Sequence, residues 1–202
     1  MSATAKISGH EAASASSSPL RPARYADIAM VHGRLQEAID SSPHYRAPFK
    51  TYEKARLSKL YLASLLDADP HHVMVMEQGG GPAGFMLSGP ELGTLWLYWA
   101  YIYPEHRHSR LALTAMRAFV EHWDNGRFHK IATYTRPGNA APQAIIQRAG
   151  FVQVATLRQH MFGEDYLLHE RTLTKVEPGY DHGTSWGIAQ RARRMVKLAV
   201  AR

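Results

Sequence analysis

One short segment constrains the fold more than any other part of the chain. Residues 94–103 read Thr-Leu-Trp-Leu-Tyr-Trp-Ala-Tyr-Ile-Tyr, a run of aromatic and aliphatic side chains that is typical of a β-strand. Both faces of such a strand are apolar, so we expect it in the centre of a sheet. Pro104 ends the run, a polar loop follows, and a helical pattern begins near Ser109. The chain therefore has to build a sheet around a strand–loop–helix unit.

The rest of the sequence supplies further strands and helices on both sides of this unit. They indicate an α+β fold, with a mixed, mostly antiparallel central sheet flanked by helices and a βαβ crossover in the second half. Asp27 is expected to cap the first helix. The other expected elements are an edge strand at 20–23, a helix at 52–66, a hairpin at 72–87, a helix at 109–123, a strand at 129–135, a helix at 140–149, and strands at 151–157 and 166–173.

Composition narrows the class of protein. The 202 residues are 45% hydrophobic and 20% charged, which is ordinary for one folded soluble domain with a small appendage. The absence of cysteine excludes disulfides, thiol nucleophiles and cysteine-ligated zinc. The histidines show no metal-binding spacing, so we expect no metal site. No apolar run approaches the roughly 20 residues of a membrane-spanning helix, and residues 1–18 lack a secretory pattern, so we expect a cytoplasmic protein.

The charge is concentrated at one end of the chain. The formal net charge is +7, and residues 186–202 carry five cations and no acid. We therefore divide the chain into a disordered segment (1–18), a folded domain (19–175), and a linker with a basic amphipathic helix (176–202). The helix is expected either to pack on the domain or a second subunit, or to contact acidic lipid or nucleic acid, or to stay mobile. Its expected apolar stripe consists of Ile188, Ala192, Met195 and Ala199.

The loop before the helix at 109–123 has the chemistry of a phosphate site. A helix N-terminus offers unpaired backbone N–H groups and a partial positive charge. Arg107 and Arg110 add two cations. A ligand that carries a diphosphate fits this arrangement, although a solvated basic helix start has the same composition.

Two motifs in register resemble those of the GCN5-related N-acetyltransferases (GNAT). Ile102-Tyr103-Pro104-Glu105-His106-Arg107, followed by a helix, is similar to the cofactor motif of that family. Asn139, followed by Gly150-Phe151, resembles the second family motif, and the expected order of elements from about 20 to 175 matches the family fold.

This resemblance implies that the chain binds acyl-CoA. In the family the central strand separates from its neighbour and pairs with the pantetheine arm, and the loop amides hold the pyrophosphate. The implied strand contacts are Ile102 and Tyr103, the loop contacts are Arg107, His108, Ser109, Arg110, Leu111 and Ala112, and Asn139 adds a further contact.

The chain departs from the family pattern at the loop glycine and at the catalytic positions. Arg110 replaces the central loop glycine, and Ile146 replaces the tyrosine that often serves as general acid. No carboxylate or histidine lies in the central strand. The candidate catalytic residues are therefore Tyr98, at a position where a base can occur, and Tyr101, with Tyr103 or Tyr134 as substitutes for the acid. A tyrosine with a pKa near 10 is a poor base at neutral pH.

The leading hypothesis is an acyl-CoA-dependent N-acyltransferase that moves an acetyl group to the primary amine of a small molecule or a peptide. One alternative is a non-catalytic GNAT-fold module for binding or assembly, in which a homo-oligomer or another partner contacts the tail. Another is transfer from an acyl-carrier-protein thioester. The aromatic residues of the strand at 94–103 are either core or an acceptor pocket, with Tyr98 and Trp96 on one face and the other rings opposite. In the loop at 41–51, the candidates for meeting an acceptor are His44, Tyr45 and Arg46.

Overall fold

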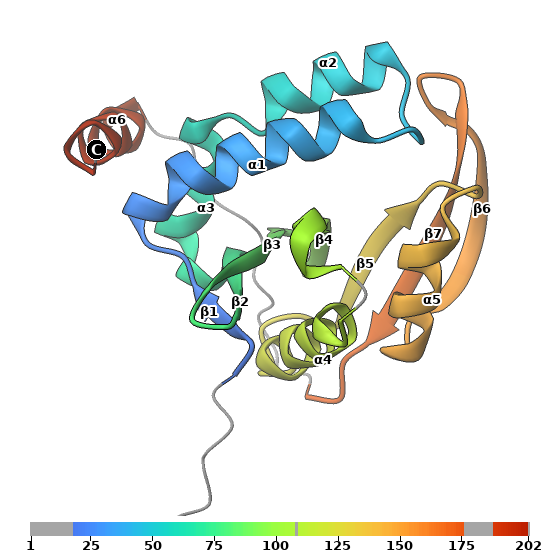
Figure 1. The fold of residues 1–202 in the computed structure, drawn as a ribbon. Coiled ribbons are helices and arrows are strands. Elements are labelled where there is room, and N and C mark those ends of the chain that lie inside the picture. Colours follow the sequence, from blue (N-terminus) through green and yellow to red (C-terminus); the bar gives the residue numbers. More distant parts are fainter. Residues whose placement is uncertain (1–17, 108, 176–187, 202) are drawn as a thin grey trace, which may run out of the picture.

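The computed structural model describes residues 18–107, 109–175 and 188–201, so nearly all of the segment predicted to be disordered lies outside the described residues. The described chain forms one seven-stranded sheet (Figure 1). Every neighbouring pair is antiparallel except β4 and β5, which confirms the predicted mixed, mostly antiparallel sheet flanked by helices. From edge to edge the strands are β1 (Leu20–Pro22), β2 (Val73–Gln78), β3 (Gly81–Glu91), β4 (Thr94–Ile102), β5 (Lys130–Thr135), β7 (Glu164–Thr172) and β6 (Val152–Met161).

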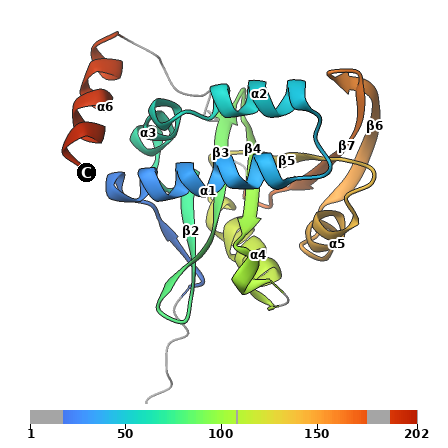
Figure 2. The same cartoon turned by 45° about the horizontal axis from the view of Figure 1, so that its top comes forward.

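Helices cover both faces of this sheet. Two buried clusters separate the layers, one between the sheet and α4 and α5, the other between the sheet and α1 and α3. Figure 2 shows α2 beside α1 and α6 at the periphery next to α3. None of the described helices is long and apolar enough to cross a membrane. The α-helices are α1 (Ile28–Ser41), α2 (Ala47–Arg56), α3 (Lys59–Ala68), α4 (Leu111–Trp123), α5 (Ala140–Arg148) and α6 (Ile188–Val200), and the 3₁₀ helices are η1 (Tyr25–Asp27), η2 (Pro70–His72) and η3 (Pro104–His106).

The prediction of a single helix at 52–66 is wrong, because this region contains parts of two helices, α2 and α3, with a break between them. Leu57 leaves the helical conformation at φ −87° and ψ 48°. The Ser58 hydroxyl then accepts a hydrogen bond of 3.3 Å from the Tyr61 amide and caps α3. The break lets α2 and α3 take different directions above the sheet (Figure 2).

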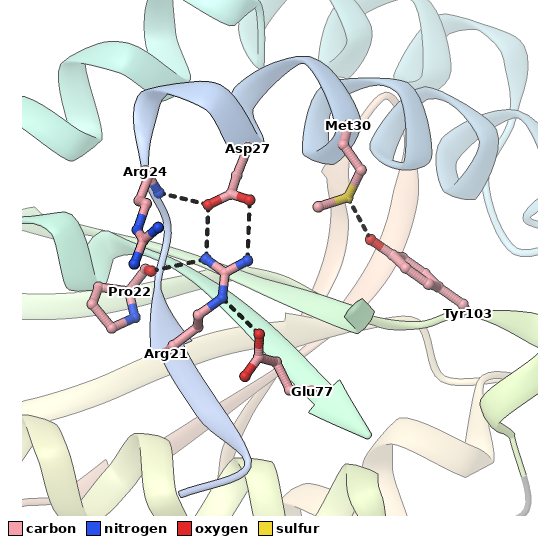
Figure 3. A network of polar contacts seen from close by, with 7 residues as sticks. All are labelled: Arg21, Pro22, Arg24, Asp27, Met30, Glu77 and Tyr103. Carbon is pink, nitrogen blue, oxygen red and sulfur yellow. Dashed lines mark hydrogen bonds and ion pairs between the residues drawn. The ribbon is translucent and has the colours of Figure 1, made fainter. Parts of the chain in front are cut away.

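Asp27 precedes α1 as predicted, but it does not cap that helix. Its carboxylate accepts the Arg24 amide at 2.7 Å and forms a bidentate pair with Arg21 at 2.7 and 3.0 Å (Figure 3). Arg21 Nε also donates to Glu77 at 2.7 Å. The hydrogen bonds from Arg21 outweigh the cost of burial and lower the Asp27 pKa. One guanidinium thus ties β1 and β2 to the start of the helical layer.

A β-bulge changes the side-chain pattern of β4. Its pairing with β3 shifts from Leu87↔Trp99 to Ser88↔Leu97, which leaves Tyr98 as the extra residue. The side chains of β4 therefore do not alternate regularly between the two faces of the sheet. Tyr98 and Trp99 both pack against the buried cluster under α1 and α3, and are not on opposite faces as the sequence predicted.

Candidate active site

Strands β4 and β5 separate in the middle of the sheet. They pair only at Thr94↔Lys130, Leu95↔Ile131 and Trp96↔Ala132. At the point of divergence, the Thr133 hydroxyl donates to the Leu97 carbonyl at 2.9 Å. Beyond it, β4 remains paired with β3, but its opposite edge over residues 98–102 has no strand partner in the described chain. The central strand therefore presents an unpaired backbone edge.

The open end of this divergence leads to the N-terminus of α4 (Figure 1). The first amides of a helix have no partner within the helix, and here no side chain caps them at the N-cap position, Arg110. The Ser109 hydroxyl accepts from the Leu111 amide at 3.2 Å and donates to the His106 carbonyl at 2.9 Å. Ser109 thus shapes the loop and leaves the amides of Ala112 and Leu113 available for an anion.

Arg110 stands in an ordinary backbone conformation, with φ −77° and ψ −1°. The described residues with positive φ lie elsewhere in the chain. The glycine expected from the family pattern is therefore not needed for the path of this loop, and the arginine introduces no backbone strain. Its exposed guanidinium adds charge beside the helix N-terminus.

The other implied cofactor contacts have distinct environments. Arg107 is exposed, donates to the Tyr101 hydroxyl at 3.4 Å and lies over its ring at 5.6 Å. Ile102 is half-buried at the end of β4, opposite Gly84. Tyr103 is buried, and its hydroxyl donates to the Met30 sulfur at 3.0 Å (Figure 3). The implied contact at His108 lies outside the described residues.

Asn139 stands just before α5, and its side chain caps no amide of that helix. The end of the helix favours glycine at Gly150, because φ is +85° there, a conformation that strains residues with a Cβ. Ile146, where the family often has a tyrosine, is 3% exposed in the core. This helix therefore offers an amide side chain at its start but no proton donor at its centre.

The two candidate catalytic tyrosines lie apart from each other. Tyr98 is half-buried, and its ring packs on Gly89, where a Cβ would come within 2.6 Å of the hydroxyl. Its ring also lies beneath the Arg56 guanidinium at 4.9 Å. Burial raises the Tyr98 pKa above its ordinary value. Tyr101 instead faces Arg107, near the loop.

The sequence did not reveal most of an aromatic cluster that lies beside the divergence, on the face of the sheet that α1, α2 and α3 cover. Trp96 and Tyr134 lie 4.9 Å apart, and Tyr134 also contacts Tyr166 and His160 at 6.2 and 5.2 Å. A second group joins Tyr45, which stacks on Phe49 at 4.3 Å, to Trp99 at 5.8 Å. Phe49 connects the groups through Tyr166 at 6.4 Å. The cluster comes from β4, β5, β6, β7 and the region of α2, so local periodicity could not reveal it.

Ion pairs join the elements around this aromatic cluster. Glu164 accepts from Arg46 at 2.7 Å and is also paired with Arg136, which links the segment before α2 to the β6–β7 turn. The segment 41–51 thus lies against β7, and Arg46, a candidate for meeting an acceptor, pairs with a carboxylate of this chain.

A second pair lies deeper. Glu53 is buried, accepts from the Trp99 indole at 2.7 Å, and forms a bidentate pair with Arg56 at 2.8 and 2.7 Å. Glu53 and Glu164 are therefore both paired with arginines. Within the described residues, no group of three or more His, Asp or Glu side chains is arranged to hold a metal ion.

Three solved structures illustrate the likeness of the fold. A ribosomal-protein-alanine N-acetyltransferase from Brucella melitensis is 20% identical, with a TM-score of 0.62 over 76% of this chain and 99% of that chain. The putative acetyltransferase yncA from Salmonella typhimurium, solved with acetyl-CoA, is 20% identical, with a TM-score of 0.61 over 80% and 96%. RimJ from Mycobacterium smegmatis, in complex with CoA-disulfide, is 20% identical, with a TM-score of 0.58 over 89% and 88%.

At these identities the solved structures show a shared fold. The comparison with curated proteins found no significant match. The family model of the acetyltransferase (GNAT) domain matches residues 19–152, which is most of the chain and includes the β4–loop–α4 unit and the helix that ends at Gly150. The chain therefore belongs to the GNAT acetyltransferase family.

Proposed function

We propose that this protein transfers an acetyl group from acetyl-CoA to a primary amine. The observation that carries the proposal is the divergence of β4 from β5, which opens toward the N-terminus of α4 between Arg107 and Arg110. CoA carries an extended arm with amides and a diphosphate. The open edge of β4 can pair with the arm, and the N-terminus of α4 beside it can hold the diphosphate.

The cofactor is proposed to bind mainly through backbone groups. The pantetheine arm carries two amides, and these pair with the open edge of β4 like an added strand. The pyrophosphate lies on the first amides of α4, and the arginines supply charge-assisted hydrogen bonds. The proposed contacts are Ile102, Tyr103, Arg107, His108, Ser109, Arg110, Leu111, Ala112 and Asn139.

The reaction is a direct transfer. The neutral amine attacks the thioester carbonyl, a C–N bond forms, the C–S bond breaks, the nitrogen loses a proton and the CoA thiolate gains one. Because burial raises the Tyr98 pKa, its phenol stays protonated at neutral pH. We therefore propose that the Tyr98 hydroxyl donates a hydrogen bond to the reacting thioester, and that water removes the proton of the amine. Tyr101 is proposed to position Arg107.

The acceptor is proposed to enter over the aromatic cluster. Half-buried rings of Tyr45, Trp96 and Tyr134 line this side of the divergence, and the carboxylates of Glu53 and Glu164 are already paired with arginines. This environment favours an amine next to an apolar or planar group over a polycation. Similar structures include enzymes named for ribosomal-protein N-termini, which makes a peptide α-amine the first acceptor to screen.

The test begins with calorimetric titration of acetyl-CoA and desulfo-CoA into the full chain. We expect both to bind, because desulfo-CoA keeps the arm and the phosphates. A screen of peptide and small amines then follows thiol release from acetyl-CoA. Binding without turnover on any amine would favour the non-catalytic module. Absence of binding would contradict the proposal and favour a carrier-protein thioester as donor.

A further inference from the structure

The C-terminal helix α6 packs on α3 through its charged side. Arg194 Nε donates to Asp67 at 2.7 Å, Lys197 Nζ donates to the same carboxylate at 3.1 Å, and the Tyr25 hydroxyl is a third donor. Arg194 is only 4% exposed, and Leu198 packs against the cluster under α1 and α3. Burial alone would raise the Asp67 pKa, but these hydrogen bonds outweigh it and the pKa is lowered. The polar interactions therefore fix which side of α6 faces the domain.

The opposite side of α6 is apolar and uncovered. Met195, Val196 and Val200 are 63, 64 and 81% exposed. Ala192 and Ala199 are exposed as well, and the five residues follow the i, i+3, i+4, i+7, i+8 spacing of one helix face. We call them the outer face of α6. In Figures 1 and 2, α6 lies at the edge of the molecule, and among the described elements α3 and the region before α1 lie next to it.

Packing of the apolar stripe on the domain was one of the alternatives that the sequence left open. In the structure Ala192, Met195 and Ala199 are exposed, and the charged side of α6 faces α3 instead. The reason is Asp67, which binds two cations of α6 and lies beside the Tyr25 ring, over which Lys197 Nζ stands at 4.9 Å. The three hydrogen bonds to the Asp67 carboxylate hold the charged side of α6 against α3. The side chain of Ile188 lies outside the described residues.

The charges near the outer face specify the chemistry of its partner. Arg193 is exposed beside this face, Lys197 borders it on the side of Asp67, and residues 182–202 contain no acid. A second copy of this helix would bring cations against cations. Nucleic acid would satisfy the cations but leave the apolar stripe in water.

An anionic membrane surface satisfies both parts, because acyl chains take the apolar stripe and headgroups take the exposed guanidinium of Arg193. We propose that the outer face of α6 binds a membrane surface that contains anionic lipid. The helix lies flat on the lipid and holds the acetyltransferase domain beside it. The inference is independent of the proposed function.

The experiment measures co-sedimentation of the full chain with vesicles. We expect binding to phosphatidylcholine vesicles that contain phosphatidylglycerol, little binding to pure phosphatidylcholine, and weaker binding at high salt. Val196→Gln with Val200→Gln should weaken binding about tenfold, because both side chains lose their transfer into the apolar layer. Arg193→Gln should weaken binding to the anionic vesicles alone.

Val152→Gln is the matched control, because Val152 is 61% exposed on β6, far from α6 in sequence. It should leave vesicle binding unchanged. Because all of these side chains point into water, the variants should keep the unfolding midpoint of the parent chain. The proposal would be overturned if the chain with both Val196→Gln and Val200→Gln bound anionic vesicles as tightly as the parent chain. It would also be overturned if the parent chain did not bind anionic vesicles. A concentration-dependent dimer in sedimentation velocity that the same variants abolish would overturn it as well, since a second copy would then cover the face.

Discussion

The two sides of the β4–β5 divergence are built in different ways. On the side where we propose that the cofactor binds, the groups available to a ligand are backbone amides of α4, the open edge of β4, and the exposed cations Arg107 and Arg110. On the side where we propose that the acceptor enters, the structure depends on side chains: contacting rings, the pair of the buried Glu53 with Arg56, and Glu164 between two arginines. The cofactor side is thus fixed by the path of the chain, and the acceptor side by the identity of its residues.

This difference separates binding from stability. The cations on the proposed cofactor side, Arg107 and Arg110, are exposed and carry little folding energy, so their substitution should change CoA affinity alone. Side chains on the acceptor side hold elements together across the sheet, so their substitution should change folding first. The predictions below test this division, from the largest expected effect to the smallest.

The largest effect is expected from Glu53→Gln on the acceptor side. It leaves Arg56 without its counter-charge in a half-buried site, and the free energy of unfolding should fall by about 3 kcal/mol. Glu37→Gln is the matched control, because Glu37 pairs with Arg34 at the same i,i+3 spacing but is exposed. Urea unfolding should show a loss of at most about 0.5 kcal/mol for the control. Equal losses would remove the distinction between the two sides.

The second prediction concerns Asp69, which joins the end of α3 to the segment before β5 through a pair with Arg127. Burial would raise its pKa, but hydrogen bonds from His71 and Arg127 outweigh this and lower the pKa to about 2. Because the folded pKa is depressed, the stabilisation is present above about pH 4 and is lost as the pH falls toward 2.

The matching variant is Asp69→Asn, which should be less stable than the parent by about 1–2 kcal/mol at pH 7, allowing for solvent screening. This difference should shrink between pH 4 and pH 2 in urea unfolding. A difference in stability that stays constant over that pH range would show that the charge of Asp69 does not hold α3 to the segment before β5.

On the cofactor side, Arg110→Ala should weaken acetyl-CoA binding about tenfold, the value of one charge-assisted hydrogen bond. The unfolding midpoint without ligand should not move, because the guanidinium is exposed. Arg117→Ala removes an equally exposed cation further along α4 and should keep the parent affinity in calorimetry. If both variants bind alike, Arg110 contributes only to net charge.

The smallest effect is expected from Arg46→Ala. Its side chain is 78% exposed, and its partner Glu164 keeps the pair with Arg136. The loss of stability should be at most about 0.5 kcal/mol. Arg136→Ala should cost more, because Arg136 also lies 5.0 Å over the Tyr166 ring. The reverse order in urea unfolding would contradict this assignment.

The fold was largely predictable because its signals are local. Aromatic composition fixed β4, Asn125-Gly126 and Gly150 marked the ends of α4 and α5, and the glycine cluster at 79–81 marked the β2–β3 turn. The errors also have local causes. Ser58 is a helix cap inside an apolar pattern, and the bulge at Tyr98 leaves no mark in the periodicity.

The sequence could group candidate site residues only on the proposed cofactor side. There a single stretch of chain, from β4 to α4, carries most of the candidates, so spacing alone places them near one another. The acceptor side unites Tyr45, Glu53, Tyr134 and Tyr166 from four parts of the sequence, and their meeting depends on how the sheet curves. The sequence also left open which side of α6 faces the domain, because Asp67 lies more than a hundred residues before Arg194.

The most direct test of the central claim is hydrogen–deuterium exchange of the full chain with and without acetyl-CoA. The account predicts protection in two places, the β4 backbone over residues 98–102 and the first turn of α4, with little change in α2 and β6. Protection confined to other segments, or none at saturating acetyl-CoA, would contradict the placement of the cofactor between β4 and β5.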